Sequence, residues 1–401
     1  MLKFTARDRL KLVFGGSAVL LGACGGGSSN SGFEDNALAI TPPPPVSPPP
    51  PPTGSTMQPG LLKNSFQNNF EIGAAVNNTQ LNPAGLSAEI ALDQFNSITP
   101  EYELKADIIA PQEGVYNFEQ GDRVVDWALA NGMSVRGHAL LWHEATPAWM
   151  LEGTPAQIRN KLETYISDVM DHYRGRITDW DVVNEAISID IFNGNNGIGP
   201  DRPTPWYEAV GNADYIDWAF MAARAADPNA RLFLSDYETE NVIKRGYMVE
   251  ILERLSARNI PIDGVGHQFH LNLATNPQDA MAAIDAVDNQ FMGLVNHVTE
   301  LDISCYQDPG SCWESGVNCD PDLGPEAPED FLSTQAQLLR DIFNGLVTKS
   351  SVESVSFWGV RDSDSWLNSV PAERYNYPLL FDRDGNPKSG FHAITDPDYV
   401  I

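Results

Sequence analysis

Two glutamates of this chain adjoin short apolar segments whose composition is typical of buried strands. Glu185 comes directly after Trp180–Asn184, and Glu300 lies within Val298–Asp302. Two carboxylates brought to one site can cleave a glycosidic bond, because one protonates the leaving oxygen while the other attacks the anomeric carbon. A single glutamate at a strand end would more simply belong to a salt bridge. The pair, rather than either residue alone, indicates this chemistry.

Other strand-like segments end in the side chains that bind a sugar. Aromatic rings stack on the CH faces of a sugar, and amides, carboxylates and imidazoles bond to its hydroxyl groups. Residues of these kinds at the segment ends are Glu101, Lys105, His138, Trp142, Asn184, Tyr237, Gln268, His270, Asp302, Trp358 and Trp366. Glu300 and Asp302 are two residues apart and face the same side of a strand. His270 could bridge these two carboxylates and keep Glu300 ionised as a nucleophile.

The histidines raise the question of a metal site. His267 and His270 are three positions apart, and His138 and His143 are five apart. Side chains at these separations on a strand point to opposite faces, so neither pair converges on one ion. The sequence therefore predicts no metal ligand set and no cofactor.

Eight apolar segments of strand length alternate with segments that mostly have helical periodicity. The candidate strands are Phe70–Val76, Ser97–Lys105, Ser134–His143, Asp179–Ala186, Arg231–Tyr237, Gly264–His270, His297–Ile303 and Ser354–Val360. This alternation predicts one α/β domain with a (β/α)8 barrel, the TIM-barrel architecture, whose functional groups lie at the carboxyl ends of the strands. A doubly wound sheet is the alternative, but it would usually have a glycine-rich turn after its first strand. Here Asn77-Asn78-Thr79 takes that place.

The N-terminal residues have the pattern of an export signal. Residues 1–23 combine a basic start with a short apolar stretch that ends in Leu21-Gly22-Ala23, directly before Cys24. This resembles the lipobox of bacterial lipoproteins, so we expect a lipidated Cys24 and an outer-membrane location, with a secreted protein as the alternative. Residues 24–60 are rich in proline, glycine and serine and predict a disordered tether. The catalytic domain is then expected at residues 61–401.

Net charge and cysteine usage limit the partners and the compartment. The formal net charge is −29, which disfavours nucleic-acid binding and flat adsorption to an anionic membrane. If Cys24 carries lipid, an oxidising compartment allows one disulfide among the other three cysteines, most simply Cys312 with Cys319. A zinc site is the alternative for Cys305, Cys312 and Cys319, but their spacing does not match the known finger patterns.

At these residues the sequence resembles glycoside hydrolase family 10, the (β/α)8 endo-1,4-β-xylanases. The matching stretches occur in the family's order and extend over residues 65–395. They are Glu101–Lys105, Arg136–His138, Trp142-His143, Trp180–Glu185, Ser235–Tyr237, Asp263–His270, Thr299–Asp302, Phe357–Val360, Ser365-Trp366, Pro378–Asp382 and Asn386–Lys388. So many motifs in one order are far more specific than any single one.

The resemblance implies a role for each matching residue. Glu185 would be the acid/base and Glu300 the nucleophile of a retaining double displacement through a glycosyl-enzyme. Asn184 would bond the 2-hydroxyl at the cleavage point, His270 and Asp302 would hold Glu300, and Tyr237 would lie toward the leaving group. The non-reducing side of xylan or of a xylo-oligosaccharide would be bound by Glu101, Lys105, His138, Trp142, Gln268, Trp358 and Trp366. We expect a monomer that contacts the membrane only through its lipid.

Four positions depart from the family pattern close to the expected sugar site. Tyr102 replaces an asparagine, Ala145 a glutamine, and Ser235 and Glu238 two asparagines. We expect the chemistry to be kept and the affinity or the preferred substitution of the glycan to differ. The segment from Cys305 to Pro328 also exceeds the family minimum, and would either wall one end of the site or be a plain surface insertion.

Two other functions stay open. One is a retaining barrel glycosidase that acts on another β-linked glycan, because fold and machinery do not fix the substrate. The other is a non-catalytic glycan-binding lipoprotein. The presence of both Glu185 and Glu300 argues against this second alternative.

Overall fold

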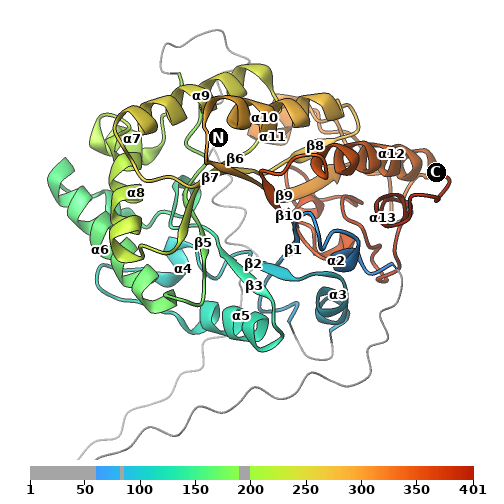
Figure 1. Cartoon of the computed structure of the whole chain (residues 1–401), viewed down its shortest axis with the longest axis horizontal. Helices are drawn as coiled ribbons and strands as arrows, with labels where there is room; N and C mark the ends of the chain where they lie inside the picture. The colour runs from blue at the N-terminus through green and yellow to red at the C-terminus, as the bar shows by residue number, and fades with distance from the viewer. Residues whose placement is uncertain (1–59, 82–84, 189–198) are drawn as a thin grey trace, which may run out of the picture. The chain divides into compact units, whose positions relative to one another are not determined.

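Parallel strands form a closed barrel in the computed structural model, which describes residues 60–81, 85–188 and 199–401. Within these residues the eight barrel strands are β1 (Glu71–Val76), β2 (Ser97–Pro100), β3 (Ser134–Gly137), β5 (Asp179–Asn184), β6 (Arg231–Asp236), β7 (Gly264–His267), β9 (Val295–Ser304) and β10 (Val352–Phe357). Strand β10 pairs with both β9 and β1, which closes the ring (Figure 1). The predicted (β/α)8 barrel is confirmed.

Three of the candidate strands keep only four residues each in the barrel. The segment Ser97–Lys105 leaves the sheet after Pro100 and turns, with the Lys105 N–H bonded to the Tyr102 carbonyl at 3.0 Å. The segments Ser134–His143 and Gly264–His270 are each interrupted, after β3 and β7, and extend as the short strands β4 (Leu141–Trp142) and β8 (His270–Asn272). β4 pairs with β5, and β8 pairs with β9.

Helices surround the barrel strands (Figure 1). The longer helices are α3 (Leu86–Gln94), α5 (Glu119–Ala130), α6 (Pro155–Tyr173), α8 (Asp214–Ala226), α9 (Val242–Ala257), α10 (Pro277–Gln290) and α12 (Glu329–Leu346). The short ones are α2 (Leu62–Ser65), α4 (Ala106–Ile109), α7 (Pro205–Val210), α11 (Gly310–Ser315), α13 (Ser389–Thr395) and the 3-10 helices η1 (His143–Ala145), η2 (Ala148–Leu151), η3 (Asp362–Asp364) and η4 (Trp366–Asn368).

The longest helix illustrates how the sequence specifies these elements. α6 begins after Thr154, whose side chain accepts the Gln157 N–H in a capping box, and Pro155 takes the first helical position. Its apolar residues Ile158 and Leu162 recur at helical spacing and are fully buried. The helix therefore has both a defined start and a continuous face toward the barrel.

The barrel interior is not wholly apolar. Asp181 on β5 is fully buried and accepts hydrogen bonds from Arg136 Nε at 3.1 Å and from His138 Nδ1 at 3.0 Å. Arg136 Nη1 also lies 2.9 Å from His297 Nδ1. Burial alone would raise the pKa of Asp181, but the adjacent Arg136 guanidinium holds it below its usual range. The buried ion pair between Arg136 and Asp181 therefore also holds the ring of His138, which directly follows β3.

Several predictions concern residues outside the described part of the chain. The expected signal segment 1–23, Cys24 and all but the last residue of the expected tether 24–60 lie there. The described residues, which begin at residue 60, group into one unit that contains the barrel. None of the described helices combines the length and the apolar character that a membrane crossing requires.

Candidate active site

Glu185 directly follows the last residue of β5, and its backbone lies in the left-handed region with a φ of +57°. Glu238 and Phe269, just beyond β6 and β7, have φ values of +53°. A non-glycine residue in this conformation raises the free energy of the folded chain by about 1–2 kcal/mol. Three neighbouring strands thus end in strained turns at the same end of the barrel, which is typical of functional sites.

Amide and guanidinium groups surround the Glu185 carboxylate. The side-chain amides of Asn184 and Gln268 each donate to Oε1 at 3.4 Å, and Arg202 Nη1 lies 3.4 Å from Oε2. Burial alone would raise the pKa of Glu185, but Arg202 and, to a smaller extent, His143 hold it below its usual range. The positive charges therefore favour the ionised carboxylate while the site is free of substrate.

Glu300 lies on β9 and is held on one side by a histidine. His270 Nε2 is 3.3 Å from Glu300 Oε2, and His270 Nδ1 is 2.9 Å from Asp302 Oδ2. Burial alone would lower the pKa of His270, but Asp302 and Glu300 raise it to about 10. The histidine is thus an imidazolium that bridges two carboxylates, in the arrangement anticipated from the spacing of residues 300 and 302.

The second oxygen of Glu300 has a different environment. Oε1 is buried and accepts no hydrogen bond from the described residues. His138 Nδ1 lies 4.0 Å from Oε1 and is bonded instead to Asp181. A buried carboxylate oxygen without a donor is costly to maintain, so it commonly marks a reactive position.

Gln268 links the two glutamates. Its amide nitrogen lies 3.2 Å from Asn184 Oδ1 and 3.4 Å from Glu185 Oε1. Its backbone carbonyl accepts the Glu300 N–H at 3.1 Å. A residue just beyond β7 therefore contacts residues of both β5 and β9, so that Glu185 and Glu300 belong to one site.

Two tryptophans complete the side of the site around Glu300. The Trp358 ring lies 5.1 Å from the His138 ring and 6.4 Å from the His270 ring. Trp366 donates its indole N–H to Asp302 Oδ2 at 2.9 Å and lies 5.1 Å from the His270 ring. Both indoles therefore contact His270, and that of Trp358 also contacts His138.

The turn after β2 contributes a further cluster of polar side chains to this end of the barrel. Lys105 Nζ lies 4.5 Å from the centre of the Trp142 ring and 5.0 Å from that of Tyr102. Burial lowers the pKa of Lys105, against the opposing effect of Glu101 and Glu300. Glu101 is also buried and accepts a hydrogen bond from Asn77 Nδ2 at 2.9 Å. The turn after β2 and Trp142 thus form one cluster around Lys105 Nζ.

Tyr237 directly follows β6 and lies beside Arg202. The Arg202 guanidinium is 5.7 Å from the centre of the Tyr237 ring, and Lys244 Nζ is 3.2 Å from it. Lys244 is fully buried and pairs with Asp236 at 2.7 Å. The structure thus places every predicted sugar-contacting residue at the carboxyl end of the barrel.

The four departures from the family pattern occupy different environments. Tyr102 is 38% exposed and lies over Lys105, so it reaches the surface beside the site. Ala145 is buried in η1, and Ser235 is fully buried with its hydroxyl 3.5 Å from that of Thr299. Glu238 occupies one of the left-handed turns. Tyr102 is therefore the departure best placed to touch a bound glycan.

Sequence reasoning did not assign roles to Arg202, Arg136 and Asp181. Arg202 lies outside the strand-like segments, and no periodicity indicated that it would reach Glu185. Asp181 carried a usable signal, because a lone carboxylate inside the apolar run Trp180–Val183 must find a buried partner.

The pair Cys312 and Cys319 and the side chain of His267 are engaged in structural contacts. Cys312 and Cys319 form the expected disulfide, with 4.8 Å between Cα atoms, and Cys305 is free. Of the described residues, only these two and Asp308 form a group close enough to suggest a metal, and Asp308 is paired with Arg374. His267 lies between Thr239 Oγ1 at 2.8 Å and Asn296 Oδ1 at 2.9 Å.

Comparison with known proteins gives consistent matches over the barrel. Residues 61–397 match the model of Glycosyl hydrolase family 10. A β-1,4-xylanase of Dictyoglomus thermophilum is 39% identical over 335 residues, which are 83% of this chain and 90% of that protein. A thermostable celloxylanase of Thermoclostridium stercorarium is 36% identical, with 84% of this chain and 87% of that protein covered.

A solved structure matches equally well. The crystal structure of xylanase B from Clostridium stercorarium F9 superposes with a TM-score of 0.76 at 35% sequence identity. The match covers 84% of this chain and 99% of that one. The similarity thus spans the barrel and all of the residues assembled at its carboxyl end.

Proposed function

The chain belongs to glycosyl hydrolase family 10, and on that premise we propose that it is an endo-1,4-β-xylanase that cleaves internal bonds of xylan with retention of configuration. The observation that carries this proposal is the contrast between two carboxylates of one site. Glu300 has one oxygen held by an imidazolium and the other without a donor, whereas Glu185 is surrounded by amides and an arginine. Glu300 Oε1, which no described donor holds, is free to attack a carbon, and Glu185 supplies the proton once bound sugar has displaced water from beside it.

In the first step, Glu300 Oε1 attacks the anomeric carbon and Glu185 gives its proton to the leaving glycosidic oxygen. The bond to the leaving xylosyl chain breaks and an ester bond to Glu300 forms. In the second step, Glu185 takes a proton from water as the water attacks the same carbon, which releases Glu300 and restores the proton on Glu185. Two inversions at one carbon give net retention.

The surrounding residues have supporting roles in this proposal. Asn184 bonds the 2-hydroxyl of the sugar at the cleavage point, where such contacts strengthen in the transition state. His270 and Asp302 hold the carboxylate of Glu300. Glu101, Lys105, His138, Trp142, Gln268, Trp358 and Trp366 bind the non-reducing side of the glycan, and Tyr237 lies toward the leaving group.

The proposal is tested by NMR on the intact chain with unbranched xylohexaose. The β-anomer of the new reducing end should appear first, before mutarotation produces the α-anomer. An α-anomer that appears first would exclude the retaining mechanism. Binding of xylohexaose without cleavage would favour the non-catalytic glycan-binding protein.

Two variants separate the roles of the glutamates. Glu300→Ala should abolish cleavage of every substrate, because no other described residue replaces the nucleophile. Glu185→Ala should lose activity on xylohexaose but keep the first step on a dinitrophenyl xylobioside, whose leaving group needs no proton. Azide should then accelerate release of the glycosyl-enzyme and yield a β-xylobiosyl azide. Equal loss on both substrates in Glu185→Ala would contradict its role as the acid.

A second substrate class has one specific observation in its favour. The Thermoclostridium stercorarium relative bears the name celloxylanase, and Tyr102 alters a polar position beside the expected sugar site. Comparing kcat/KM for xylohexaose with that for cellohexaose decides between a xylanase and an enzyme of broader specificity. Cleavage of cellohexaose alone would overturn the xylanase proposal.

We also propose that the enzyme is a monomer tethered to the outer membrane through a lipid on Cys24. The support is the sequence of residues 1–24 and the Pro-rich stretch that follows. Labelling with a tagged fatty acid should mark the wild-type chain and not Cys24→Ser, which should be released in soluble form. Equal labelling of both, or of neither, would exclude lipidation at this residue. A sedimentation mass of twice the chain mass would exclude the monomer.

A further inference from the structure

The segment that follows β9 carries an exposed tryptophan close to the active site. Trp313 lies in the short helix α11 and is 47% exposed. Its ring centre is 5.9 Å from that of Trp366, with 43° between the ring planes. Trp366 in turn donates its indole N–H to Asp302, which holds His270. An unbroken series of contacts thus leads from Trp313 to the histidine beside Glu300.

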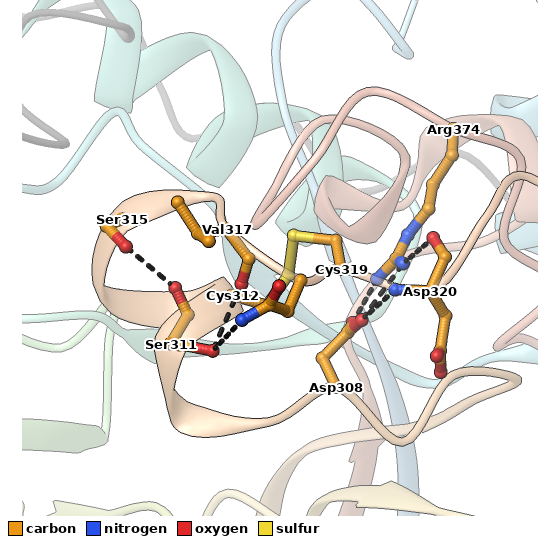
Figure 2. The surroundings of a disulfide bond; sticks show 9 residues. Asp308, Ser311, Cys312, Ser315, Val317, Cys319, Asp320 and Arg374 are labelled. Atoms are coloured by element: carbon orange, nitrogen blue, oxygen red, sulfur yellow. Dashed lines mark hydrogen bonds and ion pairs between the residues drawn. A yellow bond between two sulfur atoms is a disulfide. The ribbon is translucent and has the colours of Figure 1, made fainter.

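The position of Trp313 is fixed by the residues around it. The preceding residue, Cys312, is fully buried and is bonded to Cys319 (Figure 2). Within the enclosed segment, Ser311 Oγ donates to the Val317 carbonyl at 3.1 Å, and the Val317 N–H bonds to the Ser311 carbonyl at 3.2 Å. The helix that carries Trp313 is therefore closed into a small covalent loop with internal hydrogen bonds.

A buried ion pair attaches this loop to the segment after η4. Arg374 pairs with Asp308, and both side chains are 2% exposed. Asp308 Oδ1 also accepts the Asp320 N–H at 3.0 Å, while Arg374 donates to the Asp320 carbonyl at 2.9 Å (Figure 2). Residues on both sides of the disulfide are thereby bound to one arginine. The disulfide and the buried ion pair together hold an exposed indole in a defined position, which favours a functional loop over a plain surface insertion.

We propose that Trp313 and Trp366 form a continuous aromatic platform that binds an additional sugar unit of a long glycan, and that the Cys312–Cys319 disulfide positions Trp313 for it. This proposal rests on the proposed xylanase function. The ligand is a neutral β-linked xylose chain, because two indoles offer stacking faces and no charge. Stacking on Trp313 then matters only for substrates long enough to extend past Trp366.

The chemistry of the patch favours a sugar over a protein partner. Trp313 is 47% exposed, and the ring that it contacts is itself part of the active site. The adjacent residues Glu314 and Ser315 are exposed and polar, so the apolar surface is narrow. A narrow aromatic strip with a polar border suits a single glycan chain, whereas a protein interface buries a much larger area.

The test compares a short and a long substrate in matched variants. For Trp313→Ala, the ratio of kcat/KM for xylohexaose to that for an aryl xylobioside should fall roughly 3- to 10-fold, the loss of one aromatic stacking contact. The loss should appear in KM, because the contact is equally strong before and during the reaction. Trp313→Phe should restore most of the ratio. Val317→Ala, in the same loop and 52% exposed, is the control and should keep the wild-type ratio.

A double variant tests the disulfide. Cys312→Ser with Cys319→Ser should lower the same ratio, provided that its circular dichroism and its aryl xylobioside activity show that it is folded. An unchanged ratio in this folded variant would overturn the positioning role of the disulfide. An unchanged ratio in Trp313→Ala, or an equal loss on both substrates, would overturn the platform. If instead the wild-type chain cleaves neither substrate, the failure lies in the proposed function.

Discussion

Removal of the positive charge beside Glu185 should make the enzyme active at higher pH. Arg202 is the largest favourable influence on the ionised form of Glu185, against the effect of burial. In Arg202→Gln the carboxyl loses this partner, so its protonated form is favoured and its pKa rises. The general acid must be protonated to act, and the enzyme should therefore keep its activity to a higher pH.

The size of the shift follows from the geometry. The nearest nitrogen and oxygen are 3.4 Å apart, and the side chains of Arg202 and Glu185 are 17% and 14% exposed. Two unit charges about 4 Å apart interact by about 4 kcal/mol at an effective dielectric constant of about 20. Each pKa unit corresponds to about 1.4 kcal/mol, and solvent reduces the interaction at this exposure, so we expect a rise of about 1–2 units.

The assay is the pH dependence of kcat/KM with xylotetraose, whose alkaline limb reports the acid in the free enzyme. The limb should move upward in Arg202→Gln and stay close to its wild-type position in Arg202→Lys, which keeps the charge. Arg258→Gln removes the same charge from an exposed pair with Asp214 and Asp217 and is the control. A dinitrophenyl xylobioside needs no proton on its leaving group and should show no such limb.

Two results would refute this reasoning. One is an alkaline limb that moves by less than about half a unit in Arg202→Gln. The other is an equal shift in Arg258→Gln, which would mean that net charge and not the Arg202 contact sets the pKa. A related expectation concerns the wild-type enzyme. Bound sugar excludes water from Glu185 and so raises its pKa, and the alkaline limb of the kcat profile should therefore lie at a higher pH than that of the kcat/KM profile.

Three further predictions concern stability and specificity. Burial lowers the pKa of His267 to about 4. The contribution of the buried neutral imidazole to the free energy of unfolding is therefore complete above about pH 6.5 and is lost as the pH falls toward 4. In urea unfolding, the free energy of unfolding of wild type should fall by about 3 kcal/mol more than that of His267→Gln across this pH range. If the free energies of the two proteins instead change in parallel with pH, the lowered pKa of His267 is contradicted. Tyr102→Asn should change the ratio of kcat/KM for decorated and unbranched xylan, and an unchanged ratio would remove Tyr102 from the sugar site. Because the net charge is −29, activity on uronate-decorated xylan should rise with ionic strength, unlike activity on unbranched xylan, and a flat response would exclude this repulsion.

The barrel and the location of its site follow from local patterns in the sequence. Each barrel strand buries its apolar residues on both faces, so each appears as a short apolar run, and polar residues stand out where the run ends. Glu185 at the end of β5 and Gln268 just beyond β7 could be found in this way. Because parallel strands share one carboxyl end, the closed ring brings such residues together.

What the sequence did not reveal are contacts that depend on the path of the connecting segments. The chain leaves the sheet after Pro100, where charged residues alternate with Tyr102 and Leu104, and after Gly137, although Ala139–Trp142 are apolar. Arg202 reaches Glu185 from a segment that belongs to no strand or long helix. Trp313 and Trp366 are far apart in the chain, and no periodicity relates them. Such pairs are set by tertiary packing alone.

The left-handed backbone at Glu185 has a consequence for directed evolution of this enzyme. Glycine adopts a φ of +57° without strain and asparagine does so more readily than glutamate. Replacement of Glu185 by either residue should therefore relieve strain and also remove a buried carboxylate. A library screened only for resistance to heat would enrich such inactive sequences, so every round of selection must include turnover of substrate.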